Sequence, residues 1–236
     1  MVHPLSTTET LIVRTLGLQD YQPIWQAMQQ FTQQRQQTTI DEIWLLEHPP
    51  VFTLGRNATP SDIISTSHIP IVQIDRGGQV TYHGPGQLIA YLMIDIKRRT
   101  LGVRQFITFI EQSIINTLYE FQLSAIAKKE APGVYINDAK IAALGLRIKK
   151  GCSFHGLSLN VAMDLAPFSQ INPCGYKNLE VVQLCDYIDS TKLLPIQSTQ
   201  QNMVKDVQQK LISHLANSIG YQTILWKNGL YETHND

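Results

Sequence analysis

The chain has 236 residues, of which 43% are hydrophobic and 16% are charged, a composition that fits a globular protein with a sizeable core. Its 19 lysines and arginines balance its 19 aspartates and glutamates, so no net charge points to nucleic acid or a membrane surface as a partner. No apolar run approaches the ~20 residues of a membrane helix, and we expect no secretory leader. Three cysteines are too few, and odd in number, for a disulfide framework. We therefore expect the cysteines to be reduced thiols in a cytoplasmic protein.

The first half of the chain alternates between helical and strand patterns. Apolar residues at helical spacing predict a helix with a glutamine-rich outer face, and short apolar runs predict strands. One run stops at His48-Pro49-Pro50, where the prolines enforce extended backbone. The run at 88–96 is apolar almost throughout, which is typical of a central strand. The predicted elements are helices at 20–37 and 103–121 and strands at 43–47, 71–75 and 88–96.

The second half predicts a hairpin, a further strand and a closing helix. Asn137-Asp138 favours a tight turn of type I′ or similar between strands at 134–136 and 140–148. A strand follows at 155–161 and an amphipathic helix at 203–219. Runs of strands broken by long helices indicate an α+β fold, with a mixed sheet, instead of a βαβ repeat. We expect one domain over 1–236, with its core at about 10–226, and a polar stretch at 198–202 suggests that the last helix is an appendage.

Residues 76–88 read Arg-Gly-Gly-Gln-Val-Thr-Tyr-His-Gly-Pro-Gly-Gln-Leu, the most informative stretch of the sequence. Glycine permits a positive φ and lets the backbone approach a ligand closely. A turn between two strands would explain an isolated Gly-Gly or Gly-Pro-Gly. Because these glycines enclose an arginine, a tyrosine and a histidine instead of small polar residues, we predict a ligand-binding loop.

Cys174 differs from the other cysteines in its surroundings. Buried cysteines are usually small, inert hydrophobic residues, and we expect this of Cys152 and Cys185. Cys174 lies between proline and glycine in the Asn-Pro-Cys-Gly of 172–175, where it is poorly placed to fill a core. From the local sequence alone, a reactive thiol and an inert one are equally open.

Lys140 begins a small, apolar segment, 140–145, which indicates a buried strand. Its amine either reaches solvent along that strand or lies in a pocket with a shifted pKa, and without further context the first reading is favoured. His155 stands next to Gly156 in the third candidate segment, 153–160. His155 could take part in the site, or it could equally be a structural residue with satisfied hydrogen bonds.

Together these segments resemble the octanoyltransferase family of lipoate biosynthesis, also called lipoyl(octanoyl) transferases. The likeness runs from residue 10 to about residue 226. The family's glycine loop, lysine motif, His-Gly segment and Asn-Pro-Cys-Gly match residues 76–87, 140–145, 155–160 and 172–175. These motifs occur in the family's order and at similar separations, and none departs from its pattern.

The resemblance implies a fold similar to the catalytic domains of biotin and lipoate protein ligases. It implies transfer of an octanoyl group from octanoyl-acyl carrier protein to a lysine ε-amine of a lipoyl domain, in 2-oxoacid dehydrogenase E2 subunits and glycine cleavage H protein. Carried over by motif, Cys174 would be the acyl-thioester nucleophile and Lys140 its partner, without a cofactor or metal. The residues expected to line the acyl site are Arg76, Gly77, Gly78, Gln79, Val80, Thr81, Tyr82, His83, Ala143, Leu144, Gly145, Gly156, Leu157 and Ser158.

The residue types suit that chemistry. Attack of a thiolate on a thioester exchanges one sulfur leaving group for another, and the amine of the acceptor then forms the more stable amide. Small residues such as Gly145 and Gly156 leave room for an aliphatic chain. Backbone N–H groups of the glycine loop could stabilise the tetrahedral oxyanion. We favour Lys140 as an acid/base shuttle, because proton transfer accelerates a step by roughly 10²–10⁴, far more than a lowered thiol pKa would.

Two other functions compete with this interpretation. An ATP-dependent lipoate or biotin ligase on the same fold would hold an acyl-adenylate and need no nucleophilic cysteine, so Cys174 argues against it. A non-catalytic acyl- or partner-binding protein that kept the fold but lost activity would require damaged motifs, and there are none. Acyl carrier proteins are acidic, so we expect a local basic face. Lys97, Arg98 and Arg99 are one candidate and Arg147, Lys149 and Lys150 are another, and either segment could equally be an ordinary solvated surface.

Overall fold

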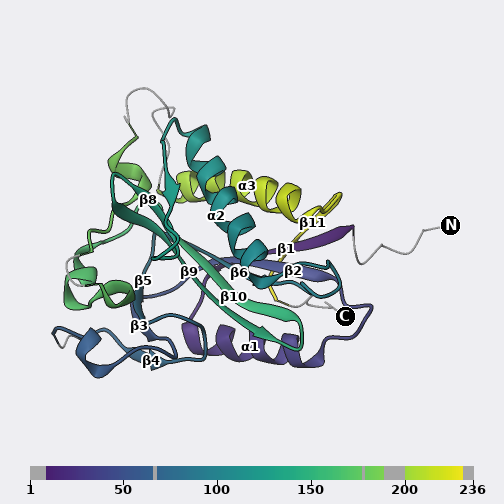
Figure 1. The fold of residues 1–236 in the computed structure, drawn as a ribbon, viewed down its shortest axis with the longest axis horizontal. Helices are drawn as coiled ribbons and strands as arrows, with labels where there is room; N and C mark the ends of the chain where they lie inside the picture. Colours follow the sequence, from purple (N-terminus) through teal and green to yellow (C-terminus); the bar gives the residue numbers. More distant parts are fainter. Residues whose placement is uncertain (1–8, 66–67, 177–178, 189–199, 231–236) are drawn as a thin grey trace.

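The computed structural model describes residues 9–65, 68–176, 179–188 and 200–230, apart from the side chains of Pro60 and Cys174. An eight-stranded mixed sheet forms its frame, in the order β11-β1-β2-β6-β10-β9-β8-β7 (Figure 1). Strand β1 runs parallel to β2 and β11, and the other neighbours are antiparallel. The strands are β1 (Thr10–Leu18), β2 (Asp41–Glu47), β6 (Gln87–Met93), β7 (Ile126–Ala127), β8 (Val134–Ile136), β9 (Ala139–Lys149), β10 (Cys152–Asn160) and β11 (Thr223–Asn228).

A second, three-stranded sheet has the order β4-β3-β5. Its strands are β3 (Val51–Leu54), β4 (Ile71–Gln73) and β5 (Val80–His83). Strand β5 lies inside the stretch that the sequence predicts as a loop. The glycine segment is therefore a short loop, 76–79, followed by a strand whose pairing with β3 holds it in place.

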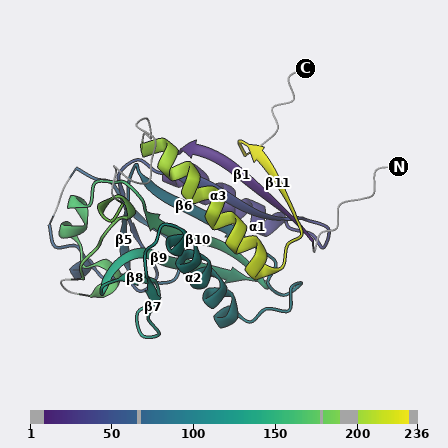
Figure 2. The same ribbon diagram turned by 90° about the horizontal axis from the view of Figure 1, so that it is seen from above.

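Three helices cover the large sheet: α1 (Tyr21–Gln34), α2 (Val103–Glu120) and α3 (Gln200–Ile219). Helices α2 and α3 lie side by side on one face, and α1 lies on the other (Figures 1 and 2). This arrangement of a mixed sheet and flanking helices confirms the predicted α+β class and the central place of the strand at 88–96.

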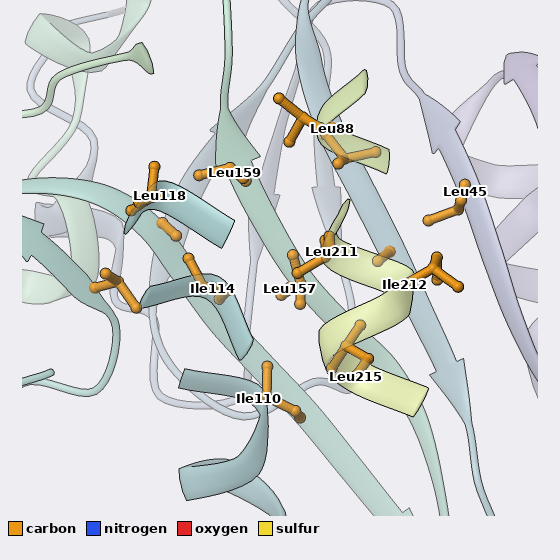
Figure 3. Packing of buried hydrophobic residues seen from close by; sticks show 14 of the residues in the cluster. Leu45, Leu88, Ile110, Ile114, Leu118, Leu157, Leu159, Leu211, Ile212 and Leu215 are labelled. Atoms are coloured by element: carbon orange, nitrogen blue, oxygen red, sulfur yellow. The ribbon is translucent and has the colours of Figure 1, made fainter. Parts of the chain in front are cut away.

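The main core lies between the sheet and the pair α2 and α3. Ile110, Ile114 and Leu118 repeat at helical spacing and point at the sheet, where they meet Leu157 and Leu159 (Figure 3). Helix α3 adds Leu211, Ile212 and Leu215 to the same cluster. The interpretation of the last helix as an appendage was wrong, because its apolar stripe closes the core and β11 beyond it pairs with β1.

The β8–β9 hairpin fixes the start of β9, where Lys140 lies. Asn137 and Asp138 have φ angles of 47° and 71°, as a type I′ turn requires, which confirms the predicted turn. On the other side, the backbone N–H of Lys140 donates to Glu180 O over 2.8 Å. The lysine is thus held between two flanking segments, and its position along β9 is set by the turn.

One of the two candidate basic faces is in fact a structural ion cluster. Asp41 is fully buried and takes ion pairs from Arg35, Arg98 and Arg99, at 2.5, 2.7 and 3.3 Å. The Arg99 guanidinium also stacks on the ring of Tyr221. Arg98 and Arg99 therefore neutralise a buried carboxylate, and the interpretation of 97–99 as a free basic face was wrong.

No helix among the described residues has the length and apolar character to cross a bilayer.

Candidate active site

Small side chains lie side by side on two neighbouring strands, β9 and β10, on the face of the sheet that carries α1. Ala143 on β9 lies opposite Ser158 on β10, and Gly145 lies opposite Gly156. On the next strand, β6, the partners of Ser158 and Gly156 are the bulky Ile89 and Tyr91. Because paired residues share one face of a sheet, the small side chains leave a channel that ends at β6.

The glycine segment covers this channel and lines one side of a narrow, partly open cavity of about 50 Å³. The loop is pinned to β9, since the N–H of Gly77 donates to Leu146 O over 3.0 Å. Gly78 has a φ of 84°, a conformation that suits glycine. The residues that line the cavity are Tyr21, Arg76, Gly78, Gln79, Val80, Thr81, His83, Ile89, Tyr91, Ala143, Leu144, Gly145, His155, Gly156, Leu157 and Ser158.

The structure thus brings together every residue predicted to line the acyl site except Gly77 and Tyr82. Gly77 lines a second, adjoining cavity of about 350 Å³, which Lys140 and the apolar side chains of Leu146 and Ile148 also line. Tyr82 packs against Phe52 and Phe168 in a separate apolar cluster.

His83 is the centre of a continuous hydrogen-bond network. Burial lowers the pKa of His83 to about 3, so its ring is neutral at pH 7. The ring donates from Nδ1 to Gln87 Oε1 over 2.7 Å and accepts at Nε2 from the Thr53 hydroxyl, 3.3 Å away. Thr53 Oγ1 accepts in turn from Arg76 Nη2 at 2.9 Å, and Gln87 Nε2 donates to Asn160 Oδ1 at 2.9 Å. Both ring nitrogens are therefore used within the protein.

A second polar network joins His48 to two tyrosines that line the cavity, Tyr91 of β6 and Tyr21 of α1. His48 donates from Nδ1 to Gln19 O over 2.6 Å, and its Nε2 lies 2.7 Å from the hydroxyl of Tyr91. Burial lowers the pKa of His48 to about 4, so Nε2 accepts this hydrogen bond. The phenols of Tyr91 and Tyr21 are hydrogen-bonded to each other, and burial raises the pKa of both. The two tyrosines are thus fixed at the β6 end of the cavity.

His155 closes the side of the cavity next to the loop. Its φ is 58°, an uncommon value for a residue with a side chain, although the pairing of β10 with β9 continues through it without a shift in register. Its Nε2 lies 2.9 Å from Asp75 Oδ1, which Trp25 Nε1 also contacts at 2.9 Å. Burial raises the pKa of Asp75, but hydrogen bonds from His155 and Trp25 outweigh it and hold the pKa at about 2. Asp75 therefore fixes the ring through Nε2, whereas Nδ1 is buried without a hydrogen-bond partner among the described residues.

Lys140 does not extend to solvent. Its side chain is buried, with 4% of the residue exposed, and its Nζ donates to Pro132 O over 3.2 Å. The amine also lies 5.2 Å from the ring centre of Tyr135. The interpretation of Lys140 as a solvent-reaching lysine was therefore wrong, and the amine remains inside the molecule. Together with Thr81, Ser158 and Pro173, Lys140 lines a small cavity that adjoins the main one.

The backbone of Cys174 lies beside this group of residues. Pro173–Gly175 forms a short 3-10 helix, and Gly175 lies against Gln79 of the glycine loop. The Cys174 side chain falls outside the described part of the structure. For the other two cysteines, burial raises the pKa of the thiols, to about 11 for Cys185, so neither is an activated nucleophile.

Comparison with known proteins places this chain in a family. Residues 20–215 match the family described as lipoyl protein ligase A/B catalytic domain. An octanoyltransferase of Vibrio cholerae is 52% identical, over 94% of this chain and 97% of its own length. One from Shewanella putrefaciens is also 52% identical, over 96% of this chain and 98% of its own. The chain is an octanoyltransferase. This confirms the family that the four motifs indicate.

Solved structures show how far the octanoyltransferase shares its fold. A lipoate protein ligase of Thermoplasma acidophilum with bound lipoic acid aligns with a TM-score of 0.69 at 14% identity, over 93% of this chain and 90% of its own. The biotin protein ligase of Aquifex aeolicus aligns with a TM-score of 0.51 at 10% identity, over 88% and 68%. The predicted likeness to the ligase catalytic domains is confirmed at the level of fold.

Several residues around the main cavity were not predicted from the sequence. Tyr21 and Tyr91 belong to elements that read as ordinary amphipathic helix and buried strand, and nothing local marks them. His48 is flagged only by the prolines that follow it. The hydrogen-bond partners of His83 and His155 lie far away in the chain, so only the assembled structure identifies them.

Proposed function

We propose that this octanoyltransferase takes its acyl group from octanoyl-acyl carrier protein and passes it to a lysine of a lipoyl domain, through a thioester on Cys174. This proposal is supported by the buried amine of Lys140. Lys140 and Pro173 line the same small cavity, which also contacts Ala143 and Ser158 of the main cavity. The acceptors would be lipoyl domains of 2-oxoacid dehydrogenase E2 subunits and glycine cleavage H protein. Residues 1–236 would act as one catalytic domain in the cytoplasm, where thiols stay reduced.

The reaction has two balanced halves. In the first, the Cys174 thiol gives its proton to the amine of Lys140, and the thiolate attacks the acyl carbonyl. The tetrahedral intermediate expels the carrier thiolate, which takes the proton back from Lys140. In the second, the lysine amine of the acceptor attacks the enzyme thioester. Cys174 leaves as the thiolate, and Lys140 relays a proton from the attacking amine to it.

The cavity under the glycine loop would hold the octanoyl chain. Its floor is formed by Ala143, Gly145, Gly156 and Ser158, and its roof by the loop at 76–79. The adjoining cavity, lined by Leu146 and Ile148, shares Gly78 and Gly145 with it and would admit the arm of the donor or the acceptor lysine. Arg147, Lys149 and Lys150 follow along the same strand and turn, and are the remaining candidate for a basic docking face.

The first test is transfer of octanoyl from octanoyl-carrier protein to a purified lipoyl domain in the absence of ATP. We expect full activity without nucleotide, because a thioester already carries the activated acyl group. A ligase would instead use free octanoate and require ATP. Product formation that depends on ATP, or no transfer from the carrier protein, would contradict the proposal.

Replacing His83 with alanine should lower the melting temperature by roughly 4–8 °C. The substitution removes two buried hydrogen bonds worth about 1 kcal/mol each, and 1 kcal/mol shifts a domain of this size by about 2–4 °C. Thermal unfolding followed by circular dichroism measures the shift, and His68→Ala, at an exposed histidine, is the matched control. Lost activity with an unchanged melting temperature would instead mean that His83 acts on the substrate.

A further inference from the structure

The cavity has one wall made of large side chains, and it faces the end where Lys140 lies. Ala143 and Ser158 line both the main cavity and the small cavity of Lys140, so they mark its reactive end. Crossing the sheet from there, β9 and β10 contribute small residues. The next strand, β6, contributes Ile89 and Tyr91. The channel is therefore open across two strands and blocked at the third.

The blocking side chains cannot easily move aside. Tyr91 is 5% exposed, and its hydroxyl is held between His48 and the phenol of Tyr21. Tyr21 is the first residue of α1, and its ring stacks on His83 with centroids 5.9 Å apart. Ile89 is 1% exposed within the cluster beneath α1. The wall is thus anchored by hydrogen bonds, ring stacking and core packing.

The spacing of the strands limits the length of chain that this channel can hold. Neighbouring strands are about 4.8 Å apart, so the backbones of β9 and β6 are separated by roughly 10 Å. An extended acyl chain gains about 1.25 Å per C–C bond, which gives about 9 Å for eight carbons. A decanoyl chain would be about 2.5 Å longer and would meet the ring of Tyr91.

We propose that Tyr91, supported by Tyr21 and Ile89, sets the length of the acyl chain that the enzyme transfers. This proposal rests on the proposed function, since it takes the cavity as the acyl site. It makes the β6 wall a determinant of specificity that touches the end of the chain, remote from the reacting carbonyl. Truncating the wall lengthens the chain that fits.

The test compares kcat/KM for octanoyl-, decanoyl- and dodecanoyl-carrier protein in the wild type and in Tyr91→Ala. Each additional CH₂ that becomes buried favours the longer chain about fourfold, so the ratio of decanoyl to octanoyl should rise roughly fifteenfold. Tyr91→Phe keeps the ring and loses only the hydroxyl, and its ratio should stay at the wild-type value. A general loss of stability lowers all rates together and does not move this ratio.

Ile89→Ala provides a second variant, because Ile89 has no polar group and its removal leaves no buried hydrogen-bond partner behind. It should also raise the ratio of decanoyl to octanoyl, should Tyr91→Ala fail to fold. Folded Tyr91→Ala or Ile89→Ala protein with the wild-type length profile would overturn the proposal. Wild-type enzyme that transfers no octanoyl group would instead contradict the proposed function, so the two failures are distinguishable.

Discussion

Replacing Cys174 with alanine is expected to lower octanoyl transfer by at least about a thousandfold, because the reaction loses its nucleophile. The wild-type protein, incubated with octanoyl-carrier protein and no acceptor, should gain one octanoyl group. Intact-mass analysis measures the adduct, and peptide mapping should place it on the peptide that contains Cys174. Adding the lipoyl domain should then discharge it.

Cys152→Ala and Cys185→Ala are the matched controls for this experiment. Both thiols have a raised pKa, so their loss should leave the adduct and the turnover unchanged. Cys152 is 8% exposed, so its variant also reports any cost of altering a buried cysteine. An adduct on either of these residues, with Cys174→Ala fully active, would exclude the proposed intermediate.

The sequence predicts most of the fold because its long elements have strong hydrophobic periods. The stripe through Ile110, Ile114 and Leu118 predicts α2 within one residue of its end, and Asn137-Asp138 predicts the β8–β9 turn. The short strands β3, β5 and β7 and the outer strands β1 and β11 were not predicted. Their pairing partners are distant in sequence, and a few apolar residues in a row do not distinguish a strand from a loop.

Some residues of the candidate site could likewise be predicted from the sequence, and others could not. Glycines and the lysine motif could be predicted because a motif is local in sequence. The wall of Tyr21 and Tyr91 and the His83 network could not, because each joins residues from different elements. The basic segment 97–99 shows the converse, since its charges are visible in sequence but their buried partner, Asp41, is more than fifty residues away. Charge patterns predict a surface only when no acidic residue reaches them in the fold.

Lys140→Met is expected to lower kcat by well over tenfold, and alkaline pH should not restore it fully. Methionine keeps the buried stem of the side chain and removes only the amine, which separates chemistry from packing. A free cysteine with a pKa of ~8.5 is about 3% thiolate at pH 7. If lysine only lowered that pKa to ~6.5, the thiolate would rise roughly 25-fold, but its nucleophilicity would fall nearly eightfold. The net gain would be about threefold.

The pH profile therefore distinguishes the two roles of Lys140. An electrostatic role predicts a loss of about threefold at pH 7 that disappears near pH 9, where the thiol ionises without help. A proton shuttle predicts a larger loss that persists, because the departing carrier thiolate and the attacking amine still lack a partner. Lys140→Arg retains the charge but cannot give up a proton at these pH values. The site is tight for the larger side chain, since a Cβ at Gly133 would lie 3.0 Å from Lys140 Cε. Complete rescue of Lys140→Met at pH 9, with a wild-type melting temperature, would reject the shuttle and leave Lys140 an electrostatic role alone.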